Sequence, residues 1–208
     1  MNEFKIDIYK GHAIIKSDEN VILIDTGAPY TIHRSDNLCF CSENFRTSSN
    51  YMGVTVQKIS EMLGMEITTL LGTNVLSEYK LLLDYKNKSA LFSKTDIDFT
   101  GQQTTISSFM GIPIIELEIN RARLKFFLDT GAQLSYLSSN YTSKYESTGS
   151  IEDFYPGVGI FQTNCYEINT KLDNYEFNVR YGNLPSLLQA TLMMSGTNGI
   201  IGYDFFNN

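Results

Sequence analysis

Two aspartates in matching sequence contexts are the residues of this chain best suited to chemistry. Asp25 follows the apolar run Ile22-Leu23-Ile24 and begins the tetrapeptide Asp-Thr-Gly-Ala; Asp129 follows Phe126-Phe127-Leu128 and begins the same tetrapeptide. The two aspartates are 104 residues apart in a chain of 208. An apolar run predicts a buried strand, and a glycine after it allows a sharp turn. Each copy therefore predicts a carboxyl group carried from a packed strand onto a tight loop.

Two such carboxyl groups, brought face to face, could share one proton and activate a water molecule. Neighbouring carboxylates cannot both ionise cheaply, so the two titrations would belong to the pair. The ionised group could then act as a general base and the protonated group as a general acid. The alternative is that each Asp-Thr-Gly is only a turn after a strand, since Asp and Gly are ordinary turn residues. Two copies in equivalent contexts favour the paired site.

The surroundings of the two aspartates are also repeated. A meander with strands at 4–9, 13–15 and 21–24 is predicted before Asp25, and a strand, a turn and a second strand are predicted before Asp129 (residues 113–128), so the copies share a hairpin. Downstream, Leu70-Leu71-Gly72 follows the first copy and Ile200-Ile201-Gly202 follows the second, in the same order. This order predicts a duplicated unit.

The composition predicts a folded, mainly β protein. Hydrophobic residues make up 42% of the chain and charged residues 19%, and there are 13 Tyr and 13 Phe. Short helices are predicted at residues 57–63 and 187–194, ended by Gly64 and Gly196. The predicted domains are an N-terminal lobe at 1–95, a polar linker at 96–108 and a C-terminal lobe at 109–208.

Several partner classes are not favoured by the sequence. The net charge is −7 and there is no Lys/Arg cluster, which argues against nucleic acid or an anionic membrane as partner. The N-terminus lacks the pattern of a signal peptide, and no apolar run approaches about 18 residues.

The cysteines predict neither a disulfide framework nor a metal site. With two His and no second Cys pair, Cys39, Cys41 and Cys165 do not form a zinc-binding pattern. We interpret them as reduced packing residues of a cytoplasmic protein, with Cys39 and Cys41 on one face of a strand. We expect no metal and no cofactor.

The paired motifs resemble those of the pepsin and retropepsin aspartic proteases. The residues that carry the resemblance are Asp25-Thr26-Gly27-Ala28 with Leu70-Leu71-Gly72, and Asp129-Thr130-Gly131-Ala132 with Ile200-Ile201-Gly202. Ala after the Gly is the retroviral type of the motif, and the length fits two retroviral-like protomers fused in one chain. The resemblance implies a mainly β, bilobed acid-protease fold with pseudo-two-fold symmetry and a few short helices, in a monomer with an internal pseudo-dimer.

The resemblance also implies an activity and a site. The chain would hydrolyse peptide bonds of a peptide or protein substrate, with Asp25 and Asp129 as catalytic residues and the hydroxyls of Thr26 and Thr130 locking the loops together. The residues that would support the dyad are Thr26, Gly27, Ala28, Thr130, Gly131 and Ala132. Because neither alanine offers a hydroxyl to stabilise a carboxylate, we expect a raised dyad pKa and a mildly acidic to near-neutral optimum.

A single flap is predicted from the unequal lengths of the two halves. Asp25 and Gly72 are 47 residues apart, whereas Asp129 and Gly202 are 73 apart. The extra length contains residues 153–166, where Pro-Gly-Val-Gly supplies a turn between β-prone flanks. The residues expected to contact substrate are Tyr155, Gly157 and Phe161. The alternative for this segment is an ordinary surface hairpin, and a weaker flap candidate lies at 49–53.

Other functions stay open at the level of sequence. The main alternative is a catalytically inactive or partner-restricted peptide-binding module that keeps a retropepsin-like cleft. A further alternative is a protease that acts only on one dedicated partner or on its own precursor. Neither His12 nor His33 lies in a recognisable context with a Ser or Cys nucleophile, so a catalytic His is not expected.

Overall fold

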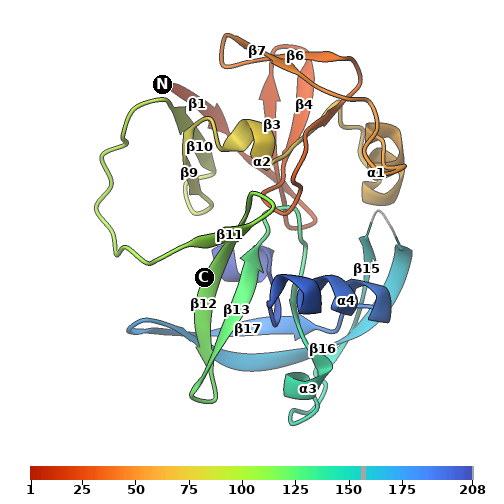
Figure 1. Ribbon diagram of the computed structural model, residues 1–208, viewed down its shortest axis with the longest axis vertical. Helices are drawn as coiled ribbons and strands as arrows, with labels where there is room; N and C mark the ends of the chain where they lie inside the picture. The colour runs from red at the N-terminus through yellow and green to blue at the C-terminus, as the bar shows by residue number, and fades with distance from the viewer. Residues whose placement is uncertain (156–157, 208) are drawn as a thin grey trace.

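The computed structural model describes residues 1–155 and 158–207 and confirms a mainly β chain. In Figure 1 the N-terminal half (residues 1–93) occupies the upper part and most of the C-terminal half (residues 107–207) the lower part. Among the described residues, every strand pairing lies within one half or the other. The division into two lobes and their pseudo-two-fold symmetry stay predictions.

The N-terminal half contains a five-stranded sheet that carries Asp25. Its order is β2-β3-β4-β8-β5 within the described residues, and β4 pairs in parallel with β8. The remaining strands form a three-stranded sheet, β1-β10-β9, and the hairpin β6-β7. The strands are β1 (Asn2–Lys5), β2 (Asp7–Tyr9), β3 (His12–Ser17), β4 (Asn20–Ile24), β5 (Ile32–His33), β6 (Asn37–Phe40), β7 (Glu43–Arg46), β8 (Thr69–Leu71), β9 (Lys80–Asp84) and β10 (Ser89–Ser93).

The C-terminal half forms a larger sheet that carries Asp129. Its described strands have the order β11-β12-β13-β18-β14-β17-β16-β15, and β13 pairs in parallel with β18 as β4 does with β8. The strands are β11 (Ser107–Phe109), β12 (Ile112–Ile119), β13 (Ala122–Leu128), β14 (Ser135–Leu137), β15 (Gly149–Tyr155), β16 (Gly159–Leu172), β17 (Tyr175–Gly182) and β18 (Gly199–Ile201). The apolar runs before both aspartates are therefore central strands, as their composition predicted.

Both predicted helices are present. α1 (Val56–Leu63) and α4 (Ser186–Ser195) end at Gly64 and Gly196, whose φ angles of 74° and 67° lie in the left-handed region that glycine accommodates. The helices that were not predicted are α2 (Thr73–Leu76), α3 (Ser139–Thr142) and α5 (Tyr203–Phe206). Each is a single turn, too short to show a helical period. In the described part of the chain, no helix has the length and apolar character needed to cross a bilayer.

Two local predictions were wrong. The alternating stretch 4–9 is two strands, because β1 pairs with β10 and β2 pairs with β3, so the chain changes sheet at Ile6. Cys39 and Cys41 do not share a strand face, because β6 ends at Phe40 and Cys41 adopts a turn conformation with φ of 53°. Cys39 is exposed, whereas Cys165 is buried.

The strand-free connection between the halves runs from 94 to 106, since β11 starts inside the predicted linker.

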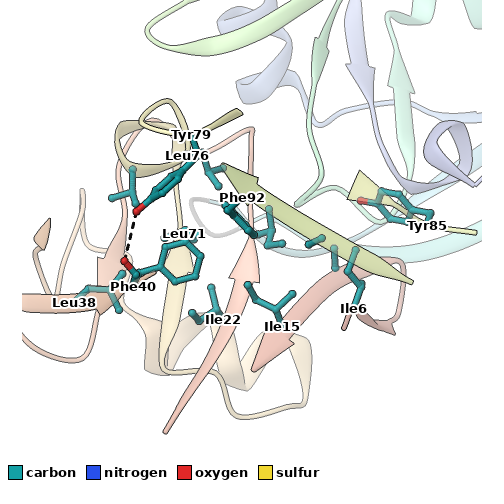
Figure 2. Close-up of a cluster of buried hydrophobic side chains, with 14 residues drawn as sticks. Ile6, Ile15, Ile22, Leu38, Phe40, Leu71, Leu76, Tyr79, Tyr85 and Phe92 are labelled. Carbon is teal, nitrogen blue, oxygen red and sulfur yellow. Dashed lines mark hydrogen bonds between the residues drawn. The ribbon is translucent and has the colours of Figure 1, made fainter. Parts of the chain in front are cut away.

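Aliphatic side chains and a group of packed aromatic rings form the core of the N-terminal half (Figure 2). The ring of Phe40 lies 5.0 Å from that of Phe92 and 5.9 Å from that of Tyr79, both edge-on. The C-terminal half contributes to this core through α5, because the ring of Phe206 stacks on Tyr85 at 5.4 Å. The two halves are thus joined by apolar burial as well as by the contacts described below.

We predict that Phe40→Ala lowers the free energy of unfolding by about 3–5 kcal/mol, because it leaves a cavity among packed rings. Phe40 is only 1% exposed. Urea denaturation measures the change. Phe99→Ala, at a position 63% exposed in the connection between the halves, is the control and should change stability by less than about 0.5 kcal/mol. Equal effects of the two substitutions would contradict this description of the core.

Candidate active site

Each aspartate sits on a loop held beneath by the apolar-apolar-Gly segment of its own half. The backbone N–H of Asp25 donates to the carbonyl of Leu71 at 3.0 Å, and that of Asp129 donates to Ile201 at 2.9 Å. Side chains at Gly72 or Gly202 would collide with the backbone of the loop above, at 2.6 Å from Tyr30 and Ala132 respectively. Glycine is needed at both places because the two chains approach so closely.

The two aspartate loops are joined by reciprocal threonine hydrogen bonds. The hydroxyl of Thr26 donates to the carbonyl of Leu128 at 2.6 Å, and the hydroxyl of Thr130 donates to Ile24 at 2.8 Å. Each hydroxyl also accepts the backbone N–H of the other threonine, at 3.1 and 3.0 Å. Because Ile24 and Leu128 immediately precede the aspartates, these bonds fix both carboxyl groups relative to each other.

The carboxyl groups of Asp25 and Asp129 meet and are hydrogen-bonded to each other. The N–H of Gly27 donates to Asp25 Oδ1 at 2.9 Å, and that of Gly131 donates to Asp129 Oδ1 at 2.8 Å. A Cβ on Gly27 would overlap the carboxyl of Asp129, and one on Gly131 would overlap that of Asp25. Glycine at these positions therefore makes room for the opposite carboxyl group.

The surroundings favour the protonated form of the pair. Both aspartates are partly exposed, so water can reach them. Burial raises the pKa of Asp25, opposed by hydrogen bonds from Asp129 and from the Gly27 and Ala28 backbone. Burial likewise raises the pKa of Asp129 well above its ordinary value, and the charge of Asp25 raises it further. The pair therefore holds a proton at pH values where an ordinary aspartate is ionised.

A hairpin formed by β15 and β16 occupies the predicted flap segment. It is longer than predicted and extends toward α1 of the other half (Figure 1). Tyr155 pairs with Gly159 at its far end, and burial, together with the charges of Asp129 and Asp25, raises the pKa of Tyr155 to about 12. Phe161 instead packs on the apolar cluster of its own half, and Gly157 lies outside the described residues. The weaker candidate at 49–53 is a tight turn with a bridge between Tyr51 and Val54.

Two buried residues beside the dyad were not singled out by the sequence. His12 is 2% exposed, and in the described structure neither ring nitrogen has a hydrogen-bond partner. Burial lowers the pKa of His12 to about 4, although the nearby backbone of Gly131 acts to raise that pKa. The imidazole is therefore neutral near pH 7. The second residue is Asp153, whose charge contributes to raising the pKa of Asp129. The sequence could have drawn attention to Asp153, because an acidic residue interrupts a β-prone segment there. Its burial could not be predicted, because it depends on Tyr136, which lies on another strand.

The remaining histidine has hydrogen-bond partners within its own half. His33 is buried in β5, with Nδ1 3.0 Å from the carbonyl of Thr68 and 2.8 Å from Thr69 Oγ1, away from the dyad. Across residues 1–155 and 158–207, no group of three or more His, Cys, Asp or Glu side chains is arranged to hold a metal ion.

Comparisons with known proteins give structural neighbours that are retropepsin-like aspartic proteases. The simian foamy virus (mac) protease matches with a TM-score of 0.33 and 15% identity over 43% of this chain and 86% of its own. EIAV protease with the inhibitor HBY-793 matches with a TM-score of 0.36 and 20% identity, over 46% and 86%. A retropepsin-like aspartic protease from Rickettsia conorii matches with a TM-score of 0.31 and 16% identity, over 50% and 81%.

The other comparisons add little. This chain spans 10% of the foamy viral protease-reverse transcriptase, which it matches with a TM-score of 0.35. No family model and no curated protein matches the sequence. These matches concern the fold only.

We predict that Thr26→Val and Thr130→Val each lower the free energy of unfolding by about 1–3 kcal/mol, because buried backbone groups lose their partners. Since the two hydroxyls belong to one network, the double variant should depart from additivity by about 0.5 kcal/mol or more. Thr163→Val is the control, because that hydroxyl bonds Asn183 within the C-terminal half. Combined with Thr26→Val it should be additive in urea denaturation; additivity of the Thr26/Thr130 pair would contradict the reciprocal contact.

We predict that Asp129→Asn stabilises the fold at pH 7 by about 1–3 kcal/mol and has little effect at pH 4. The folded-state pKa values of the pair lie above the ordinary 3.8, so the folded chain binds the proton more tightly than the unfolded chain. Stability of the native chain therefore falls as pH rises from about 4 through the folded pKa. Denaturation at both pH values measures this, with exposed Asp36→Asn as control. Destabilisation at pH 7 would contradict the buried-pair description.

Proposed function

We propose that this chain is an aspartic endopeptidase that hydrolyses peptide bonds with a water molecule activated between Asp25 and Asp129. The observation that carries the proposal is the hydrogen-bonded carboxyl pair, assembled from two loops of identical sequence. A raised pKa suits the pair to acid–base work, and partial exposure leaves it accessible to water and substrate.

In the proposed reaction the carboxyl pair transfers protons, and a water molecule is the nucleophile. The ionised carboxyl takes a proton from water as the water oxygen bonds to the peptide carbonyl carbon, and the other carboxyl protonates the carbonyl oxygen. When the tetrahedral intermediate collapses, the C–N bond breaks, one carboxyl protonates the leaving nitrogen and the other takes back a hydroxyl proton. The pair again holds one proton, so the cycle is closed.

The loop residues have supporting roles in this proposal. The Thr26 and Thr130 hydroxyls hold the loops together, and the N–H groups of Gly27 and Gly131 orient one oxygen of each carboxyl. Ala28 and Ala132 offer no hydroxyl to stabilise the charged form. We therefore expect the rate to be highest at mildly acidic to near-neutral pH.

The β15–β16 hairpin acts as the single flap in this proposal. Tyr155 is the residue best supported for substrate contact, because its phenol lies within the electrostatic influence of both aspartates. Phe161 faces the core of its own half and has a structural role instead. Gly157 is retained as a proposed flap residue from the sequence alone.

One chain supplies both aspartates, so we propose an active monomer acting on a peptide or protein substrate. The three cysteines form no disulfide, which supports a reducing, cytoplasmic location as part of the proposal. The alternative, a peptide-binding module without turnover, is not favoured, because simple binding gives no reason to keep two carboxyl groups in contact at a cost in stability.

We predict cleavage of an unstructured peptide library by the native chain, and loss of that cleavage by about 10²–10⁴-fold or more in Asp25→Asn and in Asp129→Asn. Assays from pH 3 to 8 give the pH profile, circular dichroism verifies folding, and Asp36→Asn should cleave as the native chain does. The rate should be linear in protein concentration if the monomer is active. Cleavage that survives either dyad substitution, or a maximum near pH 2, would contradict the proposal.

A further inference from the structure

Asp153 is a buried carboxyl group on the β15–β16 hairpin. It is 6% exposed and is the only fully buried residue among the seven of β15. Its Oδ1 accepts the N–H of Phe154 at 2.8 Å, and its Oδ2 accepts the hydroxyl of Tyr136. None of the ion pairs in the described residues involves Asp153. A buried carboxyl without a cation is costly, so the fold alone does not account for it.

Tyr136 holds both strands of the hairpin. Asp153 of β15 and Phe161 of β16 are direct cross-strand partners, and Tyr136 bonds the first and places its ring 6.2 Å from that of the second. Tyr136 is itself 4% exposed and lies on β14, which pairs with β18 beneath the Asp129 loop. Tyr136 therefore fixes this rung of the hairpin to the sheet that carries Asp129, in addition to the bonds between Thr163 of β16 and Asn183.

The N-terminal half offers an internal comparison. Ile32 occupies the position equivalent to Tyr136, because each lies seven residues after its aspartate and pairs with the first residue of its apolar-apolar-Gly segment, Leu70 or Ile200. Between β5 and α1 the N-terminal half has the short hairpin β6-β7 and the Tyr51–Val54 turn. A phenol is thus present in the half with the long hairpin, and an aliphatic side chain in the half with the short one.

The fixed rung determines where Tyr155 lies. Successive side chains of a strand alternate between its faces, so Asp153 and Tyr155 lie on the same side of β15. The same side carries Ile151 and, across the hairpin, Phe161, which pack on the cluster of Leu134 and Tyr136 that follows the Asp129 loop. The charges of both dyad aspartates also act on the Tyr155 phenol. This side of β15 therefore faces the dyad. On the opposite side, Phe154 packs on the apolar cluster of the N-terminal half that includes Ile59 of α1.

We propose that Tyr136 and Asp153 are positioning residues that hold the hairpin over the dyad and place Tyr155 against the bound peptide. This inference rests on the proposed peptidase function. The peptide would gain its contact with Tyr155 without having to order the hairpin first. Loss of the rung would then weaken substrate binding, because that ordering would occur during binding.

The test compares Tyr136→Phe, Asp153→Asn and Asp153→Ala in the full chain. Tyr136→Phe and Asp153→Ala should speed amide hydrogen exchange in 151–155 and 158–161 by about tenfold or more. Both variants should raise KM by a similar factor, with a smaller change in kcat. Asp153→Asn keeps one oxygen that can accept the Tyr136 hydroxyl and loses only the bond from the Phe154 N–H, so its effects should be smaller than those of Asp153→Ala.

Tyr181→Phe is the matched control for a purely structural effect. Tyr181 is also buried and its hydroxyl also has one side-chain partner, Thr170 at 3.0 Å, but it lies in the core away from the hairpin. It should leave hairpin exchange and KM unchanged. Equal behaviour of Tyr136→Phe and Tyr181→Phe would overturn the inference. Faster hairpin exchange in Tyr136→Phe, in a chain that cleaves no peptide, would support the anchoring and count only against the peptidase.

Discussion

The reciprocal hydrogen bonds of Thr26 and Thr130 are the contact on which the candidate site depends. Each hydroxyl bonds the carbonyl that immediately precedes the opposite aspartate, so the bonds that join the halves also set the separation of the carboxyl groups. Apolar burial between the halves, such as the stacking of Phe206 on Tyr85, has no comparable directionality. Burial brings the halves together, and the threonines determine the geometry at the dyad.

The site combines close packing with an electrostatic cost. Glycines at 27 and 131 leave room for the opposite carboxyl, and Gly72 and Gly202 let the backbone below approach the loops. The resulting dense surroundings leave the aspartates only partly exposed and raise their pKa values. An arrangement that opposes ionisation of its own carboxyl groups is unfavourable for stability and useful for proton transfer, as expected where function and stability compete.

Each half contributes one aspartate to the dyad, and the other groups around it come from one half or the other. The C-terminal half supplies the long hairpin, and Phe154 of that hairpin packs on the apolar cluster of the N-terminal half. The N-terminal half supplies His12, a neutral buried imidazole next to Gly131. Each half also carries one of the two aspartates, so neither half alone contains both carboxyl groups.

The sequence by itself determined the features that depend on neighbours in the chain. The apolar runs predicted the central strands that end at the aspartates, glycines marked the ends of α1 and α4, and the extra length of the second half predicted the place of the long hairpin. The repeated Asp-Thr-Gly-Ala also singled out the two carboxyl groups. These features follow from local periodicity, turn chemistry and internal repetition.

Only the tertiary structure decided which distant groups meet. The change of sheet at Ile6 depends on the separate partners β10 and β3, and the turn at Cys41 depends on where β6 ends. The contact of Tyr136 with Asp153 joins residues 17 apart on different strands, and the threonine contacts join residues more than 100 apart. Such contacts are set by how sheets pack in three dimensions, and no pattern of neighbouring residues encodes that packing.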